Sequence, residues 1–132
     1  MIRIAVCDDE NVIVNQIEHI ISEVCKRESI PVNIDVFYSG RELKRQVTSG
    51  TKYDIIFLDI QMKGGDGVTA AENIRKVDDN VLLIYVSGYD KYMMELFRLD
   101  VFGFIKKPID EEILTKTFLE TCLLYTSDAA DD

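Results

Sequence analysis

The chain has 132 residues, of which 47% are hydrophobic and 30% are charged, a balance that fits one soluble domain with its own core. The formal net charge of −9 at pH 7 disfavours direct binding to nucleic acid. The longest apolar runs cover about six residues, too few to cross a membrane. The three cysteines lack metal-type or CxxC spacing, and the N-terminus has no signal-peptide pattern, so we expect a cytoplasmic protein with free thiols.

Short apolar runs alternate with amphipathic stretches along the chain, a pattern typical of βα units around a parallel sheet. We expect strands at residues 2–7, 32–37, 54–59, 81–86 and 101–106. We expect helices at residues 10–27, 39–50, 66–76, 89–98 and 110–123. Ser39, followed three residues later by Glu42, predicts a capping box at the start of the second helix.

The strands differ in the burial that their sequences predict. The runs 54–59 and 81–86 are apolar on both faces, as central parallel strands are when helices cover both sides of a sheet. The run 32–37 alternates between apolar and polar residues, which indicates an edge strand. These features favour an α/β fold with a doubly wound, five-stranded parallel sheet in the order 2-1-3-4-5, similar to flavodoxin. Ligands of such sheets bind beyond the carboxyl ends of strands 1 and 3.

The last residues change in character. Residues 125–132 are small, polar and acidic, without a periodic apolar face. We therefore expect one domain over residues 1–123, followed by a flexible tail over residues 124–132. The tail resembles translated vector sequence, so we interpret it as foreign to the natural protein; a frayed natural terminus is the alternative.

Polar side chains stand at the ends of four apolar runs. Asp8 and Asp9 follow the first run, and Asp59 ends the third. Ser87 follows the fourth run, and Lys107 follows the last. Converging carboxylates repel one another, and proteins usually relieve this repulsion by binding a cation such as Mg²⁺, which prefers oxygen ligands. A lysine and a hydroxyl then suit phosphoryl oxygens, and Asp59 can act as a nucleophile that forms an acyl phosphate. Alone, each residue suits an ordinary cap or turn, but together they indicate phosphoryl transfer.

With these residues in place, the chain resembles the receiver domains of two-component response regulators. The resemblance covers residues 2 to 122. The segments that carry it are Val6-Cys7-Asp8-Asp9-Glu10, Phe57-Leu58-Asp59-Ile60-Gln61-Met62, Gly64-Gly65-Asp66-Gly67, Val86-Ser87-Gly88 and Phe104-Ile105-Lys106-Lys107-Pro108. The chain departs from the family at Lys63, where receivers usually have a proline.

The resemblance implies a role for each residue of the acidic cluster. Asp59 would be the phosphoacceptor and, with Asp9, a direct ligand of Mg²⁺. Asp8 would bind the ion through a water molecule, and the backbone carbonyl of Gln61 would complete the protein's share of the ligands. Mn²⁺ would fit the same oxygen atoms. Lys107 matches the conserved lysine of the family.

The resemblance also implies a switch. Ser87 would move towards a phosphoryl group and Phe104 would swing inward; this position is more often a tyrosine in relatives. We choose Lys107 over Lys106 because the lysine of the family directly precedes a proline, through a peptide bond expected to be cis. Gln61 and Tyr89 stand two residues beyond Asp59 and Ser87, so we expect them to tune the lifetime of the phosphoryl group.

The expected partner is a sensor histidine kinase, and the domain is not expected to be a turnover enzyme. Phosphorylation would change the surface of the helix at 89–98, the strand at 101–106 and the helix at 110–123, and favour a homodimer through it. Residues 89–108 resemble receivers joined to LytTR-type DNA-binding domains, as in the AlgR/AgrA-like group. The chain would then be a receiver without its output domain, although a single-domain regulator is the alternative.

Three other functions compete with this interpretation. A flavodoxin-like FMN carrier needs a phosphate-friendly first loop, whereas this loop begins Asp8-Asp9-Glu10 and repels phosphate. A phosphatase similar to haloacid dehalogenases would also use Mg²⁺ and an aspartyl phosphate, but it needs a DxD arrangement after the first strand. A receiver that only docks partners, without phosphorylation, is the third alternative.

Overall fold

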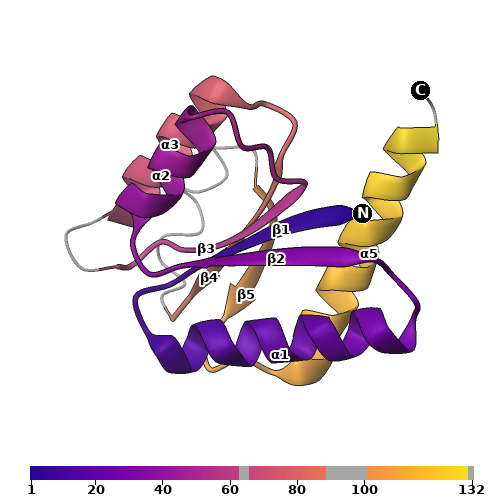
Figure 1. The fold of residues 1–132 in the computed structure, drawn as a ribbon. Coiled ribbons are helices and arrows are strands. Elements are labelled where there is room, and N and C mark those ends of the chain that lie inside the picture. Colours follow the sequence, from indigo (N-terminus) through magenta and orange to yellow (C-terminus); the bar gives the residue numbers. More distant parts are fainter. Residues whose placement is uncertain (63–65, 89–100, 131–132) are drawn as a thin grey trace.

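The structure is a computed structural model that describes residues 1–62, 66–88 and 101–130. These residues form one parallel sheet in the order β2-β1-β3-β4-β5, which confirms the predicted order (Figure 1). The strands are β1 (Ile2–Cys7), β2 (Val32–Phe37), β3 (Ile55–Asp59), β4 (Leu82–Ser87) and β5 (Val101–Lys106). The predicted strand bounds are correct to within one residue.

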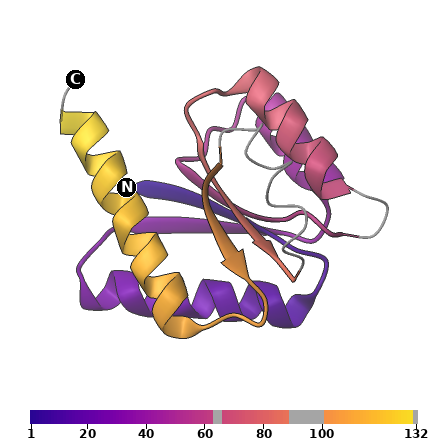
Figure 2. The same ribbon diagram turned by 180° about the vertical axis from the view of Figure 1, so that it is seen from behind.

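Helices cover both faces of the sheet. They are α1 (Asn11–Arg27), α2 (Gly40–Thr48), α3 (Asp66–Val77) and α5 (Glu111–Ala130). In both views α1 and α5 lie on one face, and α2 and α3 lie together on the other (Figures 1 and 2). Ser39 caps α2 by accepting a hydrogen bond from the backbone N–H of Glu42, as its spacing predicts. The helix predicted at 89–98 lies outside the described residues.

The last helix corrects one expectation. The sequence predicts a helix that ends at residue 123, but α5 continues to Ala130. The apolar periodicity of α5 stops near residue 123, but such periodicity indicates which residues pack on the sheet and not where the helix ends. Small residues such as alanine need no apolar neighbour to extend a helix that is already formed. The final turns of α5 therefore lengthen the helix beyond the edge of the fold (Figures 1 and 2).

The core consists of two apolar layers, one on each face of the sheet. Phe118 of α5 is fully buried in the layer that α1 and α5 cover, together with Phe57 of β3. The next residue, Leu58, belongs to the opposite layer with Leu43 of α2. Successive side chains of a strand point to opposite faces, so β3 contributes to both layers. This double burial confirms that β3 is a central strand.

Strand register brings the carboxyl ends of β1, β3, β4 and β5 to one edge of the sheet. Cys7 pairs with Leu58, Asp59 with Val86, and Ser87 with Lys106. The backbone N–H of Lys107 donates to the carbonyl oxygen of Ser87 at 2.9 Å, which extends this alignment past β5. Residues that follow these strands must therefore lie close together.

The start of α3 also lies close against this edge. A Cβ atom at Gly67 would collide with the backbone of Asp59 and Ile60. Only a residue without a side chain allows α3 to approach the end of β3 so closely. Within the described residues, no helix combines the length and the apolar character that a membrane span requires.

The packing of α5 leads to a stability prediction. Phe118→Ala should lower the free energy of unfolding by about 3–5 kcal/mol, because it removes a fully buried aromatic ring and leaves a cavity. Leu123 of the same helix is 69% exposed, so Leu123→Ala should change stability by less than about 0.5 kcal/mol. Urea unfolding followed by circular dichroism measures both variants. Equal losses would contradict the packing of α5 on the sheet.

Candidate functional site

Two buried carboxylates lie at the carboxyl ends of the central strands β1 and β3. Asp8 is 1% exposed and Asp59 is 2% exposed. In each, Oδ1 accepts a hydrogen bond from the backbone N–H two residues further on. The donor is Glu10 for Asp8, at 2.9 Å, and Gln61 for Asp59, at 2.8 Å. This local turn is one that aspartate favours after a strand, and it fixes both side chains.

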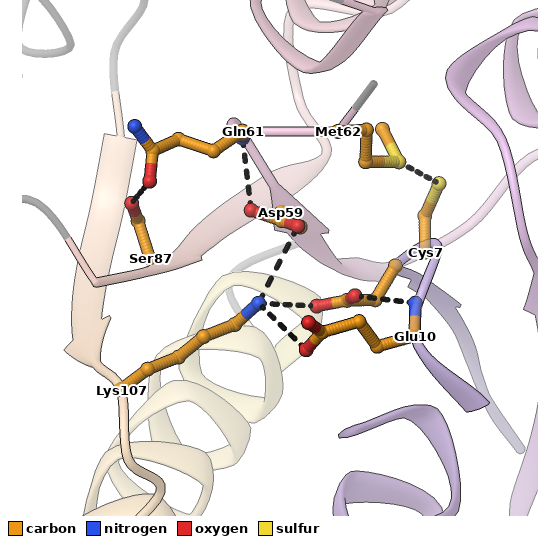
Figure 3. Close-up of polar contacts among 8 residues, drawn as sticks. Cys7, Glu10, Asp59, Gln61, Met62, Ser87 and Lys107 are labelled. Carbon is orange, nitrogen blue, oxygen red and sulfur yellow. Dashed lines mark hydrogen bonds and ion pairs between the residues drawn. The ribbon is translucent and has the colours of Figure 1, made fainter. Parts of the chain in front are cut away.

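The remaining oxygens of the two carboxylates face one amine. The Nζ atom of Lys107 lies 2.9 Å from Oδ2 of Asp8 and 3.4 Å from Oδ2 of Asp59. It also lies 3.8 Å from Oε2 of Glu10 (Figure 3). The Lys107 side chain is only 19% exposed, so water screens its ion pairs with the buried Asp8 and Asp59 only weakly, whereas Glu10 is 62% exposed. The ammonium group of Lys107 thus lies within ion-pair distance of three carboxylates.

Burial dominates the electrostatics of the cluster. Burial raises the pKa of the Asp59 carboxyl, and the charge of Asp8 raises it further, against the hydrogen bond from Gln61 and the charge of Lys107. The pKa of Asp8 is also raised, again mainly by burial. Burial by itself would lower the pKa of Lys107, but the acids around it raise that pKa above its ordinary value. Lys107 therefore stays protonated, and burial makes the charged form of each acid more costly than it is in water.

The acids are arranged to hold a hard cation. Carboxylate oxygens of Asp8, Asp9 and Asp59 lie within 4.8 Å of one another. Oδ2 of Asp8 is buried, and the ammonium group of Lys107 lies 2.9 Å from it as its ion-pair partner. Asp9 is exposed, which places one of the oxygens at the solvent side of the cluster. An all-oxygen set with spare acceptor capacity fits Mg²⁺.

Ser87 and Phe104 lie on the neighbouring strands. Ser87 ends β4, is fully buried, and donates a hydrogen bond from Oγ to Oε1 of Gln61 at 3.3 Å (Figure 3). Phe104 of β5 pairs with Tyr85 and is half-buried against the apolar layer that α2 and α3 cover. Tyr89, the other residue expected to tune the site, lies outside the described residues.

Sulfur contacts support the loop that follows Asp59. The thiol of Cys7 lies 3.8 Å from Sδ of Met62 (Figure 3). The same thiol donates to the carbonyl oxygen of Ser39 at 3.4 Å. Cys7 and Met62 are both buried. Both sulfur-containing side chains thus belong to the apolar layer that α2 and α3 cover.

The structure brings together most of the residues predicted from the sequence. Asp8, Asp59 and Lys107 are in contact, and the Lys107–Pro108 peptide bond is cis, as the resemblance implies. Lys106 is exposed, and within the described residues no ion pair joins it to Asp8 or Asp59 as one joins Lys107.

Two contacts were not predicted. The first is the approach of Glu10 to Lys107, which the third acid of the run Asp8-Asp9-Glu10 could have suggested. The second is the hydrogen bond between the side chains of Gln61 and Ser87, for which the sequence carries no signal.

Comparisons with known proteins place this arrangement in a family. The sequence pattern of the response regulator receiver domain matches residues 4–119. Over 117 residues the chain is 28% identical to the sensory transduction protein LytT of Bacillus anthracis, covering 89% of this chain and 46% of that protein. It is 27% identical over 107 residues to the sensory transduction protein LytR of Staphylococcus haemolyticus, covering 81% of this chain and 40% of that protein. The chain thus spans less than half the length of these relatives.

A solved structure has the same fold. The response regulatory domain of mrkE from Klebsiella pneumoniae superposes with a TM-score of 0.84 at 21% identity, covering 96% of this chain and 99% of that one. The family pattern includes the ends of β1, β3, β4 and β5, where the acids, Ser87 and Lys107 lie. This chain therefore belongs to the response regulator receiver domains of two-component systems, with homologues among the LytT and LytR sensory transduction proteins.

Proposed function

We propose that this domain accepts a phosphoryl group on Asp59 from the phosphohistidine of a sensor histidine kinase. The observation that carries this proposal is the buried Asp59 carboxylate, 3.4 Å from the Lys107 amine and beside the carboxylates of Asp8 and Asp9. A charged acid in such a place is costly unless its charge is used. Family membership supports the donor, since receiver domains generally act with sensor kinases.

The proposed reaction is a phosphoryl transfer between two side chains. A carboxylate oxygen of Asp59 attacks phosphorus, the P–N bond of the phosphohistidine breaks, and its electron pair returns to the imidazole. Lys107 pairs with a phosphoryl oxygen, and the hydroxyl of Ser87 donates to another. Hydrolysis of the acyl phosphate later restores Asp59. Receiver domains are generally not turnover enzymes, and here the modified group is the domain's own side chain.

Mg²⁺ would be held by the acidic cluster, and Mn²⁺ would fit the same atoms. Asp9 and Asp59 would bind it directly, Asp8 through water, and the backbone carbonyl of Gln61 would complete the set. When bound, the ion neutralises charge on the transferring group and helps to orient it. Phosphoryl transfer needs little else from the protein, because positioning and charge neutralisation supply most of the catalysis.

The output would be a change in surface. Ser87 and Phe104 would shift together on phosphorylation and alter β5, α5 and the segment at 89–98, which the structure does not describe. Phe102 of β5 and Ile113 of α5 are exposed apolar residues on this surface, 37% and 55% exposed. Such residues suit a homodimer contact that forms when the phosphoryl group biases one of two states. The output under the control of the receiver would be a LytTR-type DNA-binding domain.

The first prediction concerns the acceptor. Incubation with a small phosphodonor and Mg²⁺ should add the mass of one phosphoryl group to the intact chain, and Asp59→Asn should abolish the gain. Asp54 is the matched control, since it lies at the opposite end of the same strand and accepts the backbone N–H of Arg3. Asp54→Asn should be phosphorylated like the wild type. A gain that survives Asp59→Asn would sink the assignment, and no gain in the wild type would favour a docking module.

The second prediction concerns the metal. Mg²⁺ at about 100 times its Kd should raise the free energy of unfolding by about 2.7 kcal/mol, because it binds only the folded state. Asp9→Asn should lose most of this increment. Glu23→Gln, which removes an exposed carboxylate of α1 remote from the cluster, should keep it. Urea unfolding with Mg²⁺ and with a chelator measures the increment. An equal increment in Asp9→Asn would exclude Asp9 as a ligand.

The third prediction concerns pH in the absence of metal. The pKa of Asp59 is higher in the folded chain than its ordinary value of 3.8. The folded state therefore binds more protons than the unfolded state, and it loses stability as pH rises from 3.8 through the raised pKa. Asp59→Asn keeps an acceptor for the N–H of Gln61 but removes the buried charge. The variant should therefore be more stable than the wild type at pH 7, and the difference should shrink as pH falls towards 4. A constant difference across pH would contradict the raised pKa.

A further inference from the structure

The hydroxyl of Ser87 is already engaged while Asp59 is an unmodified carboxylate. It donates to Oε1 of Gln61 at 3.3 Å, and Ser87 is fully buried. Gln61 is the partly exposed member of this pair and reaches from the end of β3 towards the end of β4 (Figure 3). The bond therefore crosses between the two strands that carry the acceptor and the switch hydroxyl.

A serine hydroxyl has a single proton to donate. If it is to donate to a phosphoryl oxygen on Asp59, as the proposed function requires, it must first leave the carboxamide of Gln61. The two acceptors therefore compete for one donor. Whatever free energy the Ser87–Gln61 hydrogen bond contributes is subtracted from the free energy with which a phosphoryl group draws Ser87 towards Asp59.

The backbone of Gln61 is held in place independently of its side chain. Its N–H donates to Oδ1 of Asp59 at 2.8 Å, and the next residue, Met62, is buried against Cys7. A change in the Gln61 side chain should thus leave the loop and the acceptor carboxylate where they are. A substitution of Gln61 should therefore report the role of its side chain alone.

We propose that the carboxamide of Gln61 is a latch that holds the hydroxyl of Ser87 in the resting state and opposes its movement to a phosphoryl group. The inference rests on the proposed phosphorylation of Asp59 and adds a residue that regulates it. Gln61 is a positioning residue in this role, since it acts through Ser87. The latch sets how far a given degree of phosphorylation shifts the domain towards its active state.

Beryllofluoride, with Mg²⁺, is the probe of choice, because it mimics an aspartyl phosphate and is not hydrolysed. Gln61→Met keeps the length of the side chain but removes the acceptor. It should bind beryllofluoride about fivefold more tightly than the wild type, the factor that corresponds to one neutral hydrogen bond. Calorimetric titration measures the affinity, and the amide resonance of Ser87 reports its movement.

The double-mutant cycle with Ser87→Ala separates the latch from other effects of Gln61. Without the hydroxyl there is nothing to release, so Gln61→Met should produce no gain in the Ser87→Ala background. Gln46→Met is the matched control, since the Gln46 side chain also hydrogen-bonds a hydroxyl, that of Thr51, beyond the far end of α2. That variant should bind beryllofluoride with wild-type affinity.

Each other outcome overturns the inference. Wild-type affinity or weaker binding in Gln61→Met would show that the hydrogen bond does not oppose the switch. A gain of the same size in the Ser87→Ala background would show that Gln61 acts by shielding the site instead. If the wild type fails to bind beryllofluoride, or Asp59→Asn still binds it, the proposed function itself fails, and the latch fails with it.

Discussion

The site depends on a charge balance in which one half-buried amine compensates two buried carboxylates. Asp8 and Asp59 are almost fully buried, and the Nζ atom of Lys107 lies within 3.4 Å of an oxygen of each. Removing a carboxylate from water costs several kcal/mol unless charge and hydrogen bonds compensate. Here each acid receives a backbone N–H as well as the lysine, yet the pKa of both acids is raised. The compensation is therefore incomplete, which favours any further cation or any change that removes the excess charge.

The parallel sheet explains why such a balance is possible. Asp8, Asp59, Ser87 and Lys107 come from distant parts of the chain, but each follows or ends a strand whose carboxyl end lies at one edge. Two apolar layers hold the strands in register, and neither layer contains Asp8, Asp59, Ser87 or Lys107. The close approach at Gly67 packs α3 against the backbone at the end of β3. The two apolar layers thus stabilise the fold, whereas the charged residues at the edge of the sheet are costly to bury and serve function.

Much of this arrangement follows from the sequence. Strand order was predictable because continuous apolar runs distinguish central strands from the alternating edge strand β2, and chain order then determines which polar residues meet. Lys107 could be separated from Lys106 by alternation and by Pro108. The end of α5 could not be predicted, because apolar periodicity marks packing and not helix length. The Gln61 hydrogen bond could not be predicted either, since side-chain pairing across strands depends on rotamers that a sequence pattern does not encode.

Gln61 connects Asp59 at the end of β3 with Ser87 at the end of β4. Its backbone N–H binds Asp59, and its side chain binds Ser87, so one residue touches both the acceptor and the hydroxyl expected to respond to it. A phosphoryl group can shift the domain only by as much as it prefers one state over the other. A competing acceptor for Ser87 reduces that preference, and in return it keeps the unphosphorylated domain in its resting state. The neutral hydrogen bond between Ser87 and Gln61 is weak enough for a charged phosphoryl oxygen to displace it.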